Sequence, residues 1–173
     1  MTIMKQLEIL RCRANFPYFC NKYFSINFND TQQDIVNYLE DGDPLFDPYD
    51  GTLYYDNSRC KGITTIITLY NIHKLLFTEC KNAVVVRSHS FKSIIDIFKN
   101  NRKYFLTDGL MYGSDIYEAL TIIKINNYKN KSSQISVINS DRLNYYHGFP
   151  KFDEIFLDIP KQIDISRGLL YSI

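Results

Sequence analysis

The chain has 173 residues, of which 45% are hydrophobic and 23% charged, so it is long enough to bury one core and too short for two full domains. Twenty Lys and Arg against nineteen Asp and Glu give a formal net charge of +1, which excludes the strong basic bias of a general nucleic-acid or anionic-membrane binder. No apolar run reaches about 18 residues, and the first residues lack the apolar stretch of a secretion signal. We therefore expect an intracellular protein without membrane contact.

The first part of the chain, residues 1–50, is expected to be helical and then to become a loop. Apolar residues at helical intervals, Leu7 and Leu10 among them, predict helical structure from Lys5 to Tyr23. Pro17 marks the point where one short helix is expected to end and another to begin.

A further helix is predicted over residues 32–39, capped by Asp30 or Thr31. Its inward positions are Ile35, Val36 and Leu39. Glycines, prolines and aspartates predict a loop over 40–51, and the aromatic run 52–55 predicts a short strand.

The remaining residues, 51–173, alternate between strand and helix patterns. A tight loop at 57–65 leads into an apolar helix that begins at Ile66, and the continuous apolar run 83–86 predicts a buried strand. Ser90 is expected to cap the next helix, which should end near residue 100. Three cations near that end are expected to favour the helix dipole rather than contact DNA: Lys99, Arg102 and Lys103. This strand and helix order implies a parallel sheet.

Three more strands are predicted towards the C-terminus. Residues 120–125 and 135–138 flank a polar turn, whereas 111–113 are expected to form an exposed loop without a role. Residues 155–158 form a buried strand that ends on Asp158, at the sheet edge where open α/β sheets bind ligands. We expect one α/β domain over 1–173, with a parallel or mixed central sheet and helices on both faces.

The metal-binding side chains are scattered. The four cysteines form no Cys-x-x-Cys pair: Cys12, Cys20, Cys60 and Cys80. No histidine lies at a zinc-ligand interval, so we expect no metal centre and four reduced thiols, with Cys12 and Cys20 facing a core. The histidines at positions 73, 89 and 147 do not cluster in sequence, and a catalytic histidine would need partners that the sequence does not show.

The loop at 57–64 contains part of a phosphate-binding frame. Against the pattern G-x-x-x-x-G-K-[ST], Asn57 takes the first glycine position, Gly62 the second and Thr64 the hydroxyl position, but Ile63 replaces the lysine. Lys61 lies on the other side of Gly62, so its side chain should leave the loop in a different direction. Taken alone, this loop fits an ordinary β–α turn better than a phosphate site.

A wider set of motifs changes that interpretation. Gln32 precedes the first expected strand, the run 58–65 reads Ser-Arg-Cys-Lys-Gly-Ile-Thr-Thr, and the last strand ends on Asp158. In order and spacing these segments resemble the ATPase domain of the large terminase subunit, the DNA-packaging motor protein of tailed phages and herpesviruses. The family loop is Ser-Arg-x-x-Gly-Lys-Thr-Thr, which this chain matches at five positions: Ser58, Arg59, Gly62, Thr64 and Thr65.

The resemblance implies a P-loop NTPase-like fold in which Gln32 reads adenine and Asp158 and Thr64 hold magnesium, if magnesium binds at all. Ile63 and Ile159 then stand where the family has its phosphate lysine and catalytic glutamate. Losing both groups argues against ATP turnover, so weak magnesium–ATP binding is the most we expect. The fifteen residues after Asp158 leave no room for the family's nuclease domain.

The favoured function is therefore a catalytically inactive, terminase-like viral protein that acts as a binding or assembly factor in DNA packaging or head assembly. The resemblance implies a protein partner such as a terminase, the portal or another head component, DNA as a second candidate partner, and a location in the host cytoplasm or the virion. The alternative is a packaging-motor ATPase that uses Lys61 and Glu154, or residues of a neighbouring subunit. A third class is a host-directed viral protein that reuses the fold.

Overall fold

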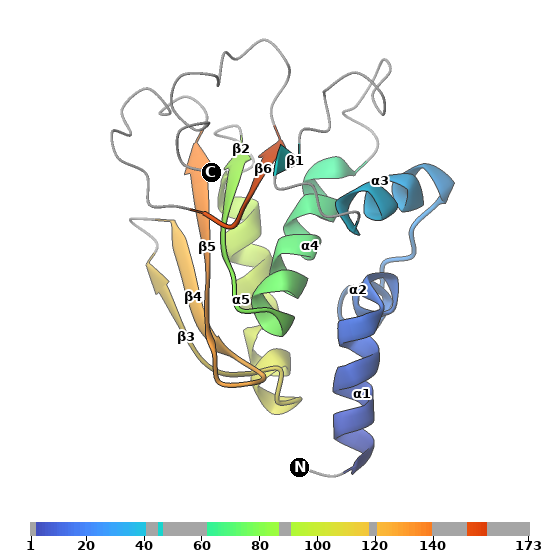
Figure 1. Cartoon of the computed structure of the whole chain (residues 1–173), viewed down its shortest axis with the longest axis vertical. Helices are drawn as coiled ribbons and strands as arrows, with labels where there is room; N and C mark the ends of the chain where they lie inside the picture. Colours follow the sequence, from blue (N-terminus) through green and yellow to red (C-terminus); the bar gives the residue numbers. More distant parts are fainter. Residues whose placement is uncertain are drawn as a thin grey trace.

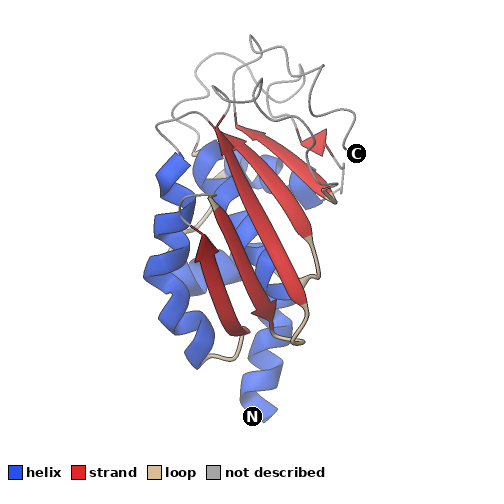
Figure 2. Cartoon of the chain, turned by 90° about the vertical axis from the view of Figure 1, so that its left-hand side faces the viewer, coloured by secondary structure: helices blue, strands red, loops and turns tan. Residues whose placement is uncertain are grey.

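In the computed structural model the chain forms a mixed β-sheet with helices packed on one face (Figure 1, Figure 2). The structure describes residues 3–40, 45–46, 62–86, 91–117, 121–139 and 152–158. The helices are α1 (Ile3–Ala14), α2 (Phe16–Phe24), α3 (Asp30–Glu40), α4 (Ile63–Phe77) and α5 (Phe91–Thr107). The strands are β1 (Leu45–Phe46), β2 (Lys81–Val86), β3 (Met111–Tyr117), β4 (Ile122–Asn127), β5 (Ser132–Asn139) and β6 (Glu154–Asp158).

The sheet has the strand order β1-β6-β2-β5-β4-β3. Strands β1, β6, β2 and β5 are parallel, whereas β4 and β3 continue the sheet as antiparallel strands. The α/β class and the mixed sheet are thus confirmed. Strand β2 is buried along nearly its whole length, which agrees with its continuous apolar sequence because a central parallel strand has little contact with water.

The expectation of helices on both faces is wrong for the described helices. The connection from β1 through α4 to β2 and the connection from β2 through α5 to β5 cross the sheet in the same direction. Because such crossovers are right-handed, both place their helix on the same face. Helices α1, α2 and α3 pack outside α4, so the described chain has three layers (Figure 1).

The break between the first two helices is confirmed. The side chain of Asn15 accepts a hydrogen bond from the Tyr18 amide at 2.7 Å, and Pro17 lies in the first turn of α2, where its missing N–H costs no hydrogen bond. Leu7 and Leu10 are exposed, whereas Ile9 and Cys12 are buried.

Helix α3 buries Ile35, Val36 and Leu39 as predicted, but its cap is Asn29 rather than Asp30 or Thr31. Asn29 accepts a hydrogen bond from the Gln32 amide at 3.0 Å, and the Gln32 side chain accepts one from the Asn29 amide at 3.1 Å. This reciprocal capping box fixes the first turn of α3.

Several element bounds differ from the sequence predictions. Leu45–Phe46 is a short strand rather than loop, because it pairs in parallel with Ile155 and Phe156. Residues 111–113 begin strand β3 instead of forming a loop. Helix α5 runs to Thr107, so the three cations expected at its end, Lys99, Arg102 and Lys103, lie within the helix. Arg102 donates to the Ser114 carbonyl oxygen at 3.2 Å. The predicted strand at 52–55 and the Ser90 cap lie outside the described residues.

The centre of the core is aromatic. His73 on α4 is buried among the rings of Phe16, Phe19 and Phe77, and its Nε2–H donates to the Cys12 carbonyl oxygen at 2.9 Å. Burial lowers the pKa of His73 to about 4, so the ring is neutral at pH 7. A buried ring that donates to the backbone has a structural role, and this accounts for one of the three histidines.

Three of the four cysteines are described, and all three are free and buried: Cys12, Cys20 and Cys80. The prediction that Cys12 and Cys20 face a core is confirmed, and burial raises the pKa of both thiols. Cys60 lies outside the described residues. Among the helices that the structure describes, none combines the length and the apolar character needed to cross a bilayer.

Candidate functional site

The predicted site belongs to the edge of the sheet where the parallel strands end. Strand β6 lies between β1 and β2, with Phe46 beside Phe156 and Val86 beside Asp158. The backbone of Asp158 is therefore two residues beyond the last β1 pair, at the carboxyl edge. The C-terminal end of α4 leads into the start of β2, at the amino edge of the sheet. The N-terminus of α4, at Ile63, therefore lies at the carboxyl edge (Figure 1).

Gly62 sets the start of α4. Its φ is +71°, in the left-handed region that glycine tolerates best, and its carbonyl oxygen accepts the first helical hydrogen bond from the Ile66 amide at 2.9 Å. A Cβ at this position would lie 3.1 Å from the Gln32 Nε2 atom. Both the backbone angle and the close approach of Gln32 therefore favour glycine here.

The structure thus brings together two residues that the sequence analysis placed in one site. Gln32 projects from the first turn of α3, where the capping box with Asn29 fixes its backbone and its Oε1 atom. Gly62 begins α4, and the two helices pack through the apolar positions of α3 and α4. The contact depends on this packing because thirty residues separate the two positions in the chain.

The start of α4 carries no acid in its first turn, and no side chain caps it. Thr64 is half-buried and Thr65 is exposed, and the helix begins with the isoleucine at position 63. The first-turn backbone N–H groups provide the helix end with its positive partial charge. The described part of this turn therefore offers amides and hydroxyls to an anion, but no ammonium group.

The remaining candidates are only partly described. Ile63 and Asp158 are placed by their backbone alone. The other candidate positions lie outside the described residues: Asn57, Ser58, Arg59, Lys61 and Ile159. Within the described ranges, no group of three or more His, Cys, Asp or Glu side chains is arranged to hold a metal ion.

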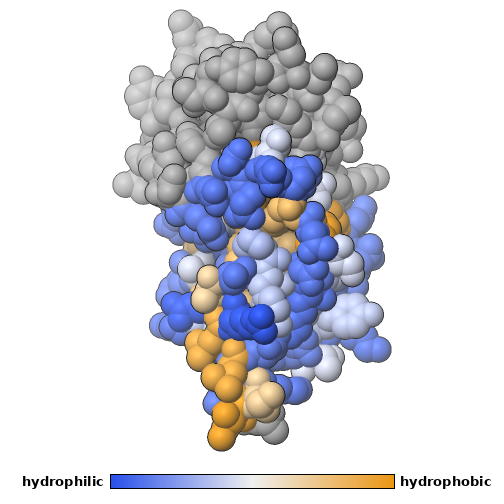
Figure 3. All heavy atoms as spheres, turned by 90° about the vertical axis from the view of Figure 1, so that its right-hand side faces the viewer, coloured by the Kyte–Doolittle hydropathy of each residue, from blue (hydrophilic) through white to orange (hydrophobic). Residues whose placement is uncertain are grey.

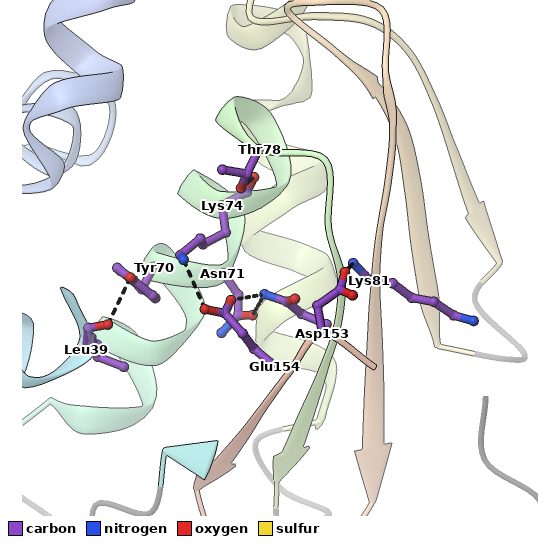
Figure 4. A network of polar contacts seen from close by, with 9 residues as sticks. Leu39, Tyr70, Asn71, Lys74, Thr78, Lys81, Asp153 and Glu154 are labelled. Carbon is purple, nitrogen blue, oxygen red and sulfur yellow. Dashed lines mark hydrogen bonds and ion pairs between the residues drawn. The ribbon is translucent and has the colours of Figure 1, made fainter. Parts of the chain in front are cut away.

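A polar network that the sequence analysis missed joins α4 to the amino ends of β2 and β6 (Figure 4). Glu154 accepts hydrogen bonds from Lys74 Nζ at 3.0 Å and from Asn82 Nδ2 at 2.9 Å, and Asn82 Nδ2 lies 3.4 Å from Asn71 Oδ1. Burial by itself would lower the pKa of Lys74, but the hydrogen bond to Glu154 helps to raise it. The sequence signal was weak, because Asn71 is one of several polar residues in α4.

This network removes Glu154 from the candidate site. Glu154 and Asp158 stand at opposite ends of β6, about 13 Å apart along a strand of this length. The Glu154 carboxylate is also engaged by Lys74 and Asn82. Its position does not fit the general base at the carboxyl edge that one version of the alternative ATPase hypothesis assigned to it.

A separate open pocket of about 350 Å³ lies at the amino edge of the sheet, between the starts of β2 and β5. Within it, the Lys81 amide donates to Asp153 Oδ2 at 2.7 Å, and the Gln134 amide donates to the Cys80 carbonyl oxygen. These polar groups satisfy one another and are remote from Gly62. We therefore assign the pocket a structural role in joining the strands.

Comparison with known proteins does not identify this site. No protein-family model matches the chain, and no curated protein matches it in sequence. The functional argument therefore depends on the chain's own residues and geometry.

Proposed function

We propose that this chain is a catalytically inactive, terminase-like protein that acts as a binding or assembly factor in viral DNA packaging or head assembly. Its carboxyl-edge site is proposed to be the remnant of a P-loop nucleotide site. The observation that carries the proposal is the contact between Gln32 and Gly62. The resemblance assigns these residues to adenine and phosphate, two parts of one nucleotide, and a nucleotide can contact both only if they lie within its own length of each other.

The topology supports the same proposal. A parallel strand followed by a glycine-initiated helix, with a neighbouring parallel strand that ends on an aspartate, is the frame that P-loop proteins use for phosphate and magnesium. Here β1, α4 and β6 supply the three parts, with Gly62 and Asp158 at the same edge, and residues 47–61 between β1 and Gly62 lie outside the described part of the chain.

The inactivity follows from two side chains. Ile63 directly follows Gly62, so the start of α4 lacks the cation that would stabilise charge on the transferring phosphoryl group. Removing one such stabilising donor commonly costs about 10²- to 10³-fold in rate. Ile159 replaces the base, and Glu154 is held by Lys74 at the other end of β6. An ATPase would therefore need Lys61 together with a base from another subunit, which no observation favours.

The proposed partners are proteins of the packaging or head machinery, such as a terminase or the portal, with DNA as a second candidate. A near-neutral net charge of +1 favours protein contact over extended DNA binding. The proposed location is the host cytoplasm or the virion.

The test is phosphate release and nucleotide binding by the purified chain. We expect no phosphate release from magnesium–ATP above the buffer control, with or without DNA. Turnover above about 0.1 per second that disappears in Asp158→Ala would overturn the inactive assignment.

The Ile63→Lys variant tests whether the site is a nucleotide remnant. If it is, the restored ammonium should create calorimetrically measurable magnesium–ATP binding without hydrolysis. Asn100→Lys is the control because it adds the same charge to an exposed helical position outside the candidate site. Equal binding by both variants, or binding by neither, would contradict a specific phosphate site at Gly62.

A further inference from the structure

Helix α1 carries an apolar stripe that faces away from the core. Ile3 is 76% exposed, Leu7 57% and Leu10 51%, and Ala14 is exposed on the same line. Met4 lies beside the stripe and is 76% exposed. Figure 3 shows these apolar side chains as a continuous band along the end of the molecule formed by α1.

The stripe is separate from the side of α1 that holds the fold. Ile9 and Cys12 are buried against the domain, and Glu8 accepts hydrogen bonds from Tyr18 Oη at 2.6 Å and from Lys22 Nζ at 2.7 Å. At the other end of the helix, Lys5 Nζ donates to the Thr107 carbonyl oxygen at 3.3 Å. These contacts fix the rotation of α1, so the stripe is presented in one defined direction.

The spacing of the stripe is that of a helix-pairing seam. Ile3, Leu7, Leu10 and Ala14 are separated by four, three and four residues, which is the alternation of the a and d positions of a heptad. Contiguous exposed apolar groups of this kind mark an interaction surface rather than a normal solvent-facing helix. A flat lipid surface does not require heptad spacing, but a second helix does.

We propose that this stripe binds a second copy of the chain, with the two α1 helices antiparallel about a twofold axis. In that arrangement Leu7 meets Leu10 of the second copy, and Ile3 meets Ala14 of the second copy. Each layer then pairs a and d positions, and the small Ala14 is always opposite a large side chain. A parallel pair would place alanine against alanine and leave a gap at that layer.

The flanking charges fit the antiparallel arrangement. Arg11 falls opposite Met4 of the second copy, and Arg13 falls opposite Gln6 of the second copy, so no like charges face each other directly. The only acid on α1, Glu8, is engaged within its own chain by Lys22.

The expected dimer is weak. The stripe has three large apolar side chains, with Met4 beside them, whereas a standard stable interface has about 20 residues on each side. We therefore expect a concentration-dependent equilibrium between monomer and dimer with a dissociation constant of about 1–100 µM, independent of whether the carboxyl-edge site binds a nucleotide.

Analytical ultracentrifugation of the full chain across this concentration range is the test. The Leu7→Gln/Leu10→Gln variant should weaken the dimer at least tenfold, with an unchanged thermal melt because both residues are already exposed. Leu106→Gln is the matched control: it removes a 40% exposed leucine from α5 and should leave the dimer unchanged. A monomer at all concentrations, or a dimer that both variants retain, would overturn the proposal.

Orientation is tested by oxidative cross-linking in a Cys60→Ser background. Ile3→Cys mixed with Ala14→Cys should form a disulfide between the two copies, whereas Ile3→Cys alone should not. Cross-linking of Ile3→Cys with itself would overturn the antiparallel arrangement. Vesicles of phosphatidylcholine and phosphatidylserine test the alternative that the stripe binds lipid. If the chain stays monomeric but binds the vesicles, and Leu7→Gln/Leu10→Gln abolishes that binding, the stripe is a lipid-binding surface instead.

Discussion

The neutral state of His73 should make the stability of this fold depend on pH. The ring is buried among Phe16, Phe19 and Phe77, and burial lowers its pKa from 6.5 to about 4. In the unfolded chain the same ring keeps its ordinary pKa, so between about pH 6.5 and pH 4 the unfolded state binds a proton that the folded state excludes. The contribution of His73 is fully present above the unfolded pKa and is lost as the pH falls towards the folded pKa.

The size of this loss follows from the two pKa values. A difference of about 2.5 pKa units corresponds to about 3 kcal/mol once both states are protonated. Between about pH 7.5 and pH 5, where the carboxylates are still largely ionised, the expected loss of unfolding free energy from this residue is about 2 kcal/mol. That is roughly a 30-fold change in the folding equilibrium constant.

Urea denaturation of the wild type and of His73→Gln at both pH values is the assay. Glutamine keeps an N–H donor for the Cys12 carbonyl oxygen but does not titrate in this range. We expect the wild type to lose about 2 kcal/mol more than the variant on acidification. An equal loss in both proteins would refute the argument, because the pH dependence would then arise from other groups.

Two further substitutions test the start of α4 and the polar network. Gly62→Ala should destabilise the fold by about 1–2 kcal/mol, because alanine is strained at a φ of +71° and its Cβ would lie 3.1 Å from Gln32 Nε2. Gly113 has open space around it, so Gly113→Ala should be close to neutral in the same urea titration. Glu154→Ala should lower the free energy of unfolding by about 1–3 kcal/mol, since it leaves the Lys74 and Asn82 donors without their acceptor. Alanine at the exposed Glu79 should change the unfolding midpoint little. Equal effects within either pair would contradict the assigned contacts.

The candidate site could be predicted from sequence only in part. The resemblance selected Gln32 and Gly62 as site residues. The capping pattern around Gln32 and the glycine before a helix are local features that can be read from a sequence. Their approach to within contact distance depends on how α3 packs on α4, which involves apolar positions that are interchangeable in sequence. Glu154 shows the reverse case: it is near Asp158 in sequence, but the extended strand carries it to the opposite end of the sheet.

The sequence by itself determined the features that depend on neighbouring residues. Pro17 separated the first two helices, the apolar run in β2 predicted a buried strand, and the order of strands and helices predicted an α/β sheet, because backbone restriction and periodicity act over a few residues. These predictions are confirmed by the structure.

Only the tertiary structure decided the features that depend on distant partners. Leu45–Phe46 is a strand because Ile155 and Phe156, more than a hundred residues later, pair with it, and a two-residue strand has too little propensity of its own. Helix α1 has apolar residues on two sides, and the domain covers Ile9 and Cys12 rather than Leu7 and Leu10. Whether a side chain is buried depends on residues that it meets only after folding. The sequence pattern of one helix therefore cannot show which of its sides the domain covers.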